Sequence, residues 1–367
     1  MKHTSENGRR AQYTLRTRTR RYLLSDPILQ LERAGLGIAL AVMFTAFGMS
    51  GTGDLFLSSA NLDNVLVSGS VVGIVALAML PPLVAGHFDL SVAAVACVSN
   101  IIAASLIGKY GLPVLLGVLL GALAGAVLGV LTGYLVAKLK LNAFVVTFGV
   151  YILLNGLTTL YTHGAQIVAG IPPSLGAWSG KSFLGVPRPF VALIVVAAVL
   201  WYALLHVPWG RKLEAIGSNE SAARLVGINV DRSVWYAFVV SGLLSGVAGS
   251  LLTSILGAGD PTAALSYLFP AFAAVFLGAT TIRPGRYNVI GTVIGVYFVG
   301  TAVSGLSLLG ADTWVQPTFN GGALIVAVGL STYLAQVRQR RQTRTSAATA
   351  SSATPSSEGT VHGITTS

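Results

Sequence analysis

Few side chains in this sequence could carry out catalysis, bind a metal or transfer protons. The 367 residues include 12 Asp and Glu, 5 His and a single Cys, Cys97. No pair of histidines has the spacing of metal ligands, and one cysteine can form neither an internal disulfide nor a cysteine-based metal site. No serine or cysteine stands in a nucleophile motif. We therefore predict that the chain is not an enzyme and that it binds no metal and no cofactor.

The carboxylates lie in polar segments or at the ends of apolar runs. A proton-coupled carrier usually needs ionisable groups at membrane depth, so this distribution disfavours one, although a sodium site built from backbone carbonyls stays open. Asp89 and Ser91 precede an apolar run. We expect them to cap the helix that follows, with contact between Asp89 and a solute as the alternative.

The composition indicates that the chain is solvated by lipid. Hydrophobic residues make up 53% of the sequence and charged residues 10%, against about 25% charged in soluble domains. The net charge of +11 does not indicate nucleic acid, because the basic residues flank apolar runs or lie in the tails. About ten runs are long enough to cross a bilayer: 34–50, 62–82, 90–107, 112–137, 143–161, 190–207, 234–256, 267–282, 287–309 and 319–337.

The distribution of positive charge predicts the topology. With the N-terminus in the cytoplasm, 20 of the 23 Lys and Arg residues fall on the cytoplasmic side, as the positive-inside rule requires. This divides the chain into a basic cytoplasmic segment (1–33), a transmembrane domain (34–337) and a polar C-terminal tail (338–367). We expect the tail to be disordered and both termini to be cytoplasmic.

The fourth apolar run carries a glycine at every fourth position. One helical turn is about 3.6 residues, so these glycines form a nearly straight stripe. Such a stripe lets two helix backbones approach closely, which favours tight packing over the alternative of a pore-lining groove. The stripe consists of Gly117, Gly121, Gly125, Gly129 and Gly133.

A polar segment, residues 209–232, separates the sixth and seventh runs. It predicts a short helix that Ser218 or Asn219 caps and that Gly227 ends in the left-handed conformation. A helix of about eight residues is not stable alone. It therefore requires a surface to pack on, either a partner protein or the membrane face, and we expect its apolar residues to supply that contact: Ala223, Leu225, Val226 and Ile228.

This segment resembles the cytoplasmic coupling loop of the ribose-type permeases of ATP-binding cassette (ABC) importers, in the branched-chain amino acid/ribose permease superfamily. The matching positions include Gly217, Asn219, Ala222, Ala223, Arg224, Leu225 and Gly227. Further stretches resemble the same family in the same order: 86–92 (GHFDLSV), 142–148, 156–164, 277–280 and 291–295. The sequence departs from the family at His87 and in the turn 283–287.

The resemblance implies an all-α integral membrane protein with the type II ABC importer permease fold, about ten helices and an inverted repeat. It also implies a bacterial plasma membrane location and three partners: a second permease subunit, an extracytoplasmic solute-binding protein and a cytoplasmic ATPase that binds ATP and Mg²⁺. By this resemblance, the ATPase contacts are Asn219, Ala222, Ala223, Arg224, Leu225 and Gly227.

The solute implied by the resemblance is a monosaccharide or a related polyol. Branched-chain amino acids or nucleosides carried by the same machine remain an alternative. A stand-alone ion-coupled carrier, and a membrane enzyme or scaffold, are further alternatives. Charged residues in the outer loops could contact the binding protein or merely be solvated: Asp54, Lys109, Asp260 and Asp312.

Overall fold

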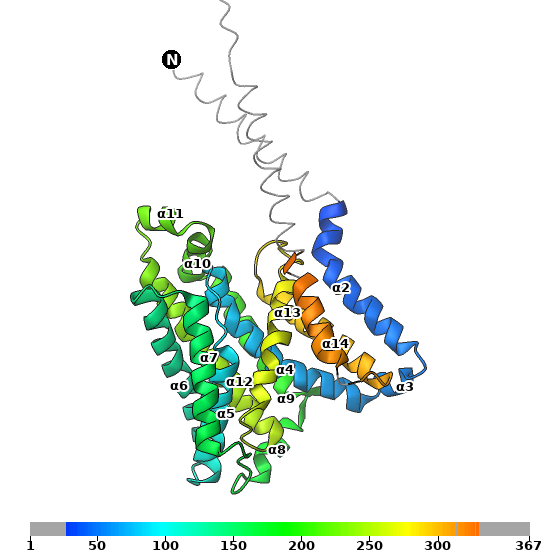
Figure 1. Ribbon diagram of the computed structural model, residues 1–367. Coiled ribbons are helices and arrows are strands. Elements are labelled where there is room, and N and C mark those ends of the chain that lie inside the picture. Colours follow the sequence, from blue (N-terminus) through cyan, green and yellow to red (C-terminus); the bar gives the residue numbers. More distant parts are fainter. Residues whose placement is uncertain (1–26, 313, 327, 330–367) are drawn as a thin grey trace, which may run out of the picture.

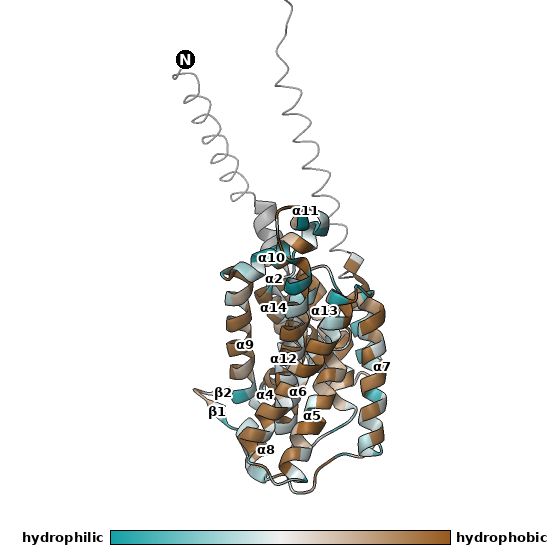
Figure 2. Cartoon of the chain, turned by 90° about the vertical axis from the view of Figure 1, so that its left-hand side faces the viewer, coloured by the Kyte–Doolittle hydropathy of each residue, from teal (hydrophilic) through white to brown (hydrophobic). Residues whose placement is uncertain are grey.

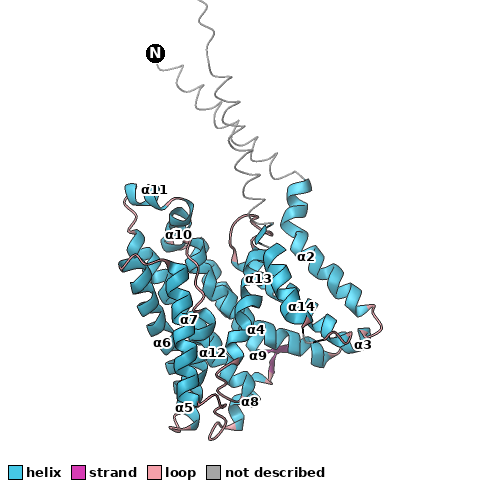
Figure 3. Ribbon diagram, viewed as in Figure 1, coloured by secondary structure: helices cyan, strands magenta, loops and turns pink. Residues whose placement is uncertain are grey.

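The computed structural model describes residues 27–312, 314–326 and 328–329. These residues are mainly helical (Figures 1 and 3), as the composition predicts. The predicted disorder of the C-terminal tail and most of the predicted cytoplasmic N-terminal segment lie outside the described residues, as does the end of the tenth predicted run.

The helices follow one another with short connections. Their bounds are α2 Pro27–Gly48, α3 Gly53–Phe56, α4 Ser59–Val84, α5 Val92–Gly108, α6 Val114–Gly133 with a π-helical extension η1 Tyr134–Lys138, α7 Ala143–Thr162, α8 Pro173–Ser179, α9 Arg188–Leu205, α10 Pro208–Ser218, α11 Glu220–Leu225, α12 Val230–Leu256, the 3₁₀ helix η2 Ala263–Tyr267, α13 Leu268–Gly278 and α14 Val289–Leu308. Residues 315–326 and 328–329 are also helical. One small antiparallel hairpin, β1 Ser182–Phe183 with β2 Val186–Pro187, lies before α9.

Six of the described helices are long and apolar enough to cross a membrane: α4, α6 with η1, α7, α9, α12 and α14. Shorter apolar helices occupy 34–48, 92–108 and 263–278. The eighth predicted run is the clearest departure, because α13 itself has only 11 residues, about 17 Å of helix. The chain is thus a multi-pass membrane protein, and the count of ten spans and the inverted repeat remain predictions.

Helix α12 organises one half of the molecule, where it packs against α4, α5 and α6. In the other half α13 and α14 pack together and against α4, and α2 lies along α14 (Figure 1). Figure 2 shows that the helix bodies are largely hydrophobic, whereas α10 and α11 at one end carry hydrophilic residues. The buried core consists mainly of small and aliphatic side chains of α4, α5, α12 and α13.

Four of the helices have an asparagine as the N-cap residue. Asn142, Asn219, Asn229 and Asn288 precede α7, α11, α12 and α14, and each accepts a hydrogen bond from a backbone N–H in the first turn. Such caps satisfy donors that the helix itself leaves free. The polar residues between the apolar runs therefore determine where these helices begin.

Candidate functional site

The segment between α9 and α12 folds as two short helices, α10 and α11, joined at Asn219. The side chain of Asn219 accepts a hydrogen bond of 2.9 Å from the N–H of Ala222, and Gly227 takes the left-handed conformation with φ +82°. The capped helix and its glycine end agree with the sequence prediction. The prediction did not include α10, which lies beside α11 at one end of the molecule (Figure 1) and packs against α4, α9 and α12.

Two of the four predicted contact residues are strongly exposed. Leu225 is 89% exposed and Val226 is 75% exposed, so the end of α11 presents an uncovered apolar tip. Ala223, by contrast, is 3% exposed and packs within the chain against a cluster that includes Leu213 and Ile216. Ala223 therefore anchors α11 and is not available to a partner, contrary to the prediction.

Arg224 is engaged within the chain. Its guanidinium donates to the carboxylates of Glu220 at 2.9 Å and Asp231 at 2.7 Å, and the Lys140 ammonium also pairs with Asp231. The hydrogen bonds that Arg224 donates to Glu220 and Asp231 raise the pKa of Arg224 above its usual value. These groups connect α11, the start of α12 and the loop between η1 and α7, so Arg224 braces the segment.

The end of α10 lies directly against the end of α4. A Cβ placed on Gly217 would lie 2.1 Å from the carbonyl oxygen of Val84, far inside van der Waals contact, so only glycine permits this approach. Gly86, just after α4, lies beside Gly217 as well. The segment 209–232 is thus in backbone contact with the link between α4 and α5.

That link, residues 85–91, is an irregular stretch between two helices, and it holds a buried carboxylate. Asp89 is 3% exposed and accepts hydrogen bonds from the N–H and hydroxyl of Ser91 and from the hydroxyl of Ser241. The side chain of Ser91 makes no capping hydrogen bond to α5, so the predicted cap is wrong for this residue. Asp89 instead pins the link to α12.

Asp89 also lies deeper than the sequence suggested. Ser241 is the twelfth residue of α12, about 17 Å along a helix of about 40 Å. The carboxylate therefore lies level with the middle of a membrane-spanning helix, although it stands near a helix end in the sequence. The serine hydroxyls and the backbone N–H of Ser91 satisfy it there.

The glycine stripe of α6 lies on the face that packs against α5 and α12. A Cβ on Gly125 would lie 2.5 Å from the carbonyl oxygen of Gly242, and one on Gly129 would lie 2.4 Å from that of Phe238. The stripe thus serves close backbone packing and does not line a groove. Its other members are also buried: Gly117 against α5, Gly121 against α5 and α12, and Gly133 against α12.

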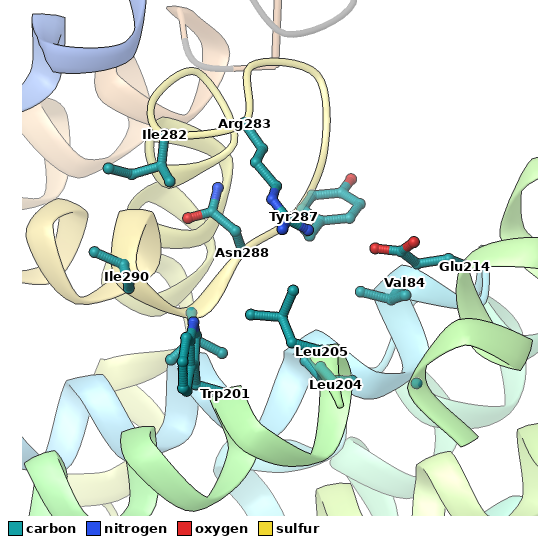
Figure 4. A pocket seen from close by; sticks show the side chains of 12 residues that line it. Val84, Trp201, Leu204, Leu205, Glu214, Ile282, Arg283, Tyr287, Asn288 and Ile290 are labelled. Carbon is teal, nitrogen blue, oxygen red and sulfur yellow. The ribbon is translucent and has the colours of Figure 1, made fainter. Parts of the chain in front are cut away.

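A pocket of about 220 Å³ lies between α9, α10 and the turn that joins α13 to α14 (Figure 4). Trp201 and Leu204 of α9 line one side, and Tyr287 and Asn288 line the other. Next to it, Arg286 of the turn pairs with Glu214 of α10 at 3.5 Å. The turn that departs from the family pattern is thereby linked to the segment 209–232.

The opposite end of the molecule carries a second polar cluster. The carboxylate of Asp260 accepts hydrogen bonds from the N–H and hydroxyl of Thr262, the N–H of Ala263 and the side-chain amide of Gln166. Burial opposes ionisation, but these hydrogen bonds outweigh it and lower the pKa of Asp260 below its usual value. Asp260, for which the sequence left both solvation and contact with the binding protein open, therefore holds loops together within the chain.

Sequence reasoning missed three features of this arrangement. Gly217 belongs to the recognised motif, but only the tertiary contact with Val84 explains why it is glycine. The pair between Glu214 and Arg286 joins positions 72 residues apart. Phe88 belongs to the stretch 86–92 that resembles the family. No hydrophobic periodicity singles it out as a functional residue, because it lies in a non-helical link.

Comparison with known proteins gives a consistent family. The family model described as "Branched-chain amino acid transport system / permease component" matches residues 61–328. The chain is 37% identical over 282 residues to the ribose import permease protein RbsC of Haemophilus influenzae, covering 76% of this chain and 87% of that protein. It is 36% identical to RbsC of Bacillus subtilis (83% and 93% covered) and 30% identical to the D-allose transport system permease protein AlsC of Escherichia coli (82% and 91% covered).

These matches span the membrane helices, the segment 209–232 and the link 85–91 together. The relatives are permeases, in agreement with the expectation that this chain is a transport subunit and not an enzyme. The chain belongs to the family of branched-chain amino acid transport system permease components.

Proposed function

We propose that this chain is the permease subunit of an ABC importer for a monosaccharide or a related polyol. In this proposal it works with a second permease subunit, a solute-binding protein and a cytoplasmic ATPase that carries ATP and Mg²⁺. The family and the ribose and allose permeases named above support this assignment. All of those named relatives transport sugars, which favours a sugar over a branched-chain amino acid or a nucleoside.

The exposed tip of α11 is the observation that carries the proposed contact with the ATPase. Leu225 and Val226 are uncovered, whereas Ala223 and the capped N-terminus hold α11 in place. Exposed large apolar residues on a rigid, polar-rimmed element are typical of a protein contact. We assign Leu225 and Val226 as the ATPase-contacting residues, and Asn219, Ala222, Ala223, Arg224 and Gly227 as those that shape the element.

The positive charge at the end of the molecule that carries α11 supports an orientation in the membrane. Lys138, Lys140 and Arg224 lie at the end of the molecule that carries α10 and α11, and an ion-pair network joins two of them. Positive charge collects on the cytoplasmic side of membrane proteins. We propose that this end faces the cytoplasm, that both chain termini lie on that side and that about ten helices span the membrane as two inverted halves.

Co-purification tests the proposal. The tagged full-length chain is extracted from its native cells in mild detergent, and co-purifying proteins are identified by mass spectrometry. We expect a cassette ATPase, and we expect Leu225→Asp to reduce its recovery strongly because a charge would replace the apolar contact. Leu184→Asp is the matched control, since Leu184 is 88% exposed in the hairpin before α9. Absence of any ATPase, even after crosslinking before extraction, would contradict the proposal.

Uptake distinguishes the possible solutes. Cells that express the complete importer should accumulate labelled D-ribose or D-allose. Cells that lack this chain but keep the other subunits should not. Uptake of leucine instead of either sugar would favour the amino acid alternative. Uptake by the purified chain alone in liposomes, sensitive to an ionophore, would favour an ion-coupled carrier.

A further inference from the structure

An aromatic-lined cavity of about 600 Å³ lies beside the irregular link between α4 and α5. Its lining includes Phe88 of the link, Phe272 and Phe276 of α13 and Phe144 of α7. The ring centroid of Phe88 lies 6.5 Å from that of Phe272 and 6.4 Å from that of Phe276. The cavity thus lies where the two halves of the helix bundle meet.

The link presents two different faces. Asp89 points inward and is bonded to Ser241, whereas Phe88 is 41% exposed and faces the cavity. Asp89 lies level with the middle of α12, so the neighbouring Phe88 lies at membrane depth. An irregular backbone at that depth is tolerated only where protein buries it or where it lines a water-filled cavity.

The hydrogen bonds of the link favour water. Among the described residues, the backbone N–H groups of Phe88, Asp89 and Leu90 donate to no other group. Leaving one backbone N–H without a hydrogen-bond partner in hydrocarbon costs several kcal/mol of free energy. Lipid is therefore a poor fit for the space beside this backbone. Free donors of this kind favour water over lipid beside the link.

We propose that this cavity is part of the path by which the solute crosses the membrane, and that Phe88 is the residue through which the coupling segment (residues 209–232) opens and closes it. This inference rests on the function proposed above. The class of ligand is a monosaccharide, whose C–H faces can lie against the aromatic walls. Because the lining offers few hydrogen bonds, the sugar is passed on and not retained, as conduction requires.

The connection to the coupling segment is direct. Gly217 of α10 is in backbone contact with Val84 at the end of α4, and Gly86 lies beside it. Phe88 follows Gly86 by two positions. The residue after Phe88 is Asp89, whose side chain is held to α12 by the hydrogen bond from Ser241. In this proposal, movement of α10 and α11 displaces Phe88 about the fixed point at Asp89.

Thiol labelling tests the proposal, because the sequence has only one cysteine. Cys97 is buried and is replaced by Ala, and Phe88→Cys is introduced in the full-length chain within membrane vesicles that contain the partner ATPase. The reagent is a charged methanethiosulfonate, which reacts in water and not in lipid. We expect Phe88→Cys to react and its rate to change at least about tenfold between nucleotide-free and ATP–vanadate states, as a population shift would produce.

Two variants serve as controls. Leu123→Cys lies on the outer face of α6, where Leu123 is 55% exposed without lining a described pocket, and Leu80→Cys is fully buried in α4. Neither should react with the charged reagent. Phe272→Cys examines the part of α13 that lies beside Phe88 and replaces Phe88→Cys if that variant does not fold.

Two results would overturn the inference. If folded Phe88→Cys and Phe272→Cys both resist the charged reagent in every nucleotide state, lipid or protein fills the cavity. If they react at the same rate in all states, the cavity is aqueous but Phe88 does not move with the coupling segment. Either result leaves the co-purification of the ATPase untouched, so the failure of this inference is distinct from failure of the proposed function.

Discussion

The carboxylate of Asp89 accepts a hydrogen bond of 2.7 Å from the hydroxyl of Ser241, although the two residues are 152 positions apart. This contact holds the link between α4 and α5 against the middle of α12. Asp89→Ala should destabilise the protein by roughly 2–5 kcal/mol, because it leaves the Ser241 hydroxyl and the Ser91 N–H buried without a partner. Thermal unfolding in detergent, followed by size-exclusion chromatography, measures the loss.

A double-mutant cycle separates this contact from other effects of Asp89. Ser241→Ala alone should cost about 1.5–3 kcal/mol, because it removes the hydrogen bond to one oxygen of the buried Asp89 carboxylate. The combination with Asp89→Ala should cost less than the sum, because the two residues interact. Additive effects would show that the hydrogen bond contributes nothing to stability.

The close contact between Gly125 of α6 and Gly242 of α12 predicts that larger side chains at Gly125 destabilise the protein. Gly125→Leu should prevent close packing of α6 on α12 and reduce the yield of folded protein, since no flexible side chain can move aside from the Gly242 carbonyl. Even Gly125→Ala should cost about 1–3 kcal/mol through overpacking. Gly149→Ala in α7 is the matched control, because a Cβ there meets nothing within 4 Å. Equal stability of the two alanine variants would disprove the packing role.

Substitution of Arg224 tests whether the ion pairs of α11 are needed to couple ATP hydrolysis to uptake. Arg224→Glu places a carboxylate against Glu220 and Asp231, which should free α11 from α12 and uncouple ATP hydrolysis from uptake while insertion is unchanged. The control is Arg211→Glu, also exposed but without an ion pair among the described residues. Hydrolysis and uptake by reconstituted importer are measured together. Normal coupling in the Arg224 variant would exclude both bracing and docking roles.

Asp231→Asn distinguishes bracing from direct contact with the ATPase. If Arg224 acts by bracing α11 against α12, Asp231→Asn should reproduce part of the uncoupling, because it removes the same ion pair and that of Lys140. A fully coupled Asp231→Asn variant would instead place Arg224 itself in the ATPase contact.

The loop held by Asp260 should respond to acid. The pKa of this carboxyl is lower in the folded protein than its ordinary value of 3.8, because its hydrogen bonds to Thr262 and neighbouring donors outweigh the effect of burial. Its contribution to stability is therefore complete above about pH 4 and is lost as the pH falls below that value through the folded pKa. Melting temperatures measured from pH 6 to pH 3 should show a smaller decrease for Asp260→Asn than for the unmodified chain. An identical acid profile would show that Asp260 does not stabilise the loop as a charge.

The sequence determined the features that depend on neighbouring residues and on the solvent. Apolar runs predict membrane helices because unpaired backbone groups are not tolerated in lipid, and six of these runs form helices long enough to span it. Asn219 and Gly227 predict the ends of a short helix because a cap and a left-handed turn are local devices. The spacing from Gly117 to Gly133 predicts a packing face for the same reason.

Only the tertiary structure decided which residues meet across the chain. It placed Ala223 inside and left Leu225 exposed, and it engaged Arg224 with Asp231 instead of leaving it free. It also carried Asp89 to membrane depth, which its position near a helix end does not reveal. Such contacts depend on how helices far apart in sequence cross one another, and local patterns of hydrophobicity and charge contain no record of that geometry.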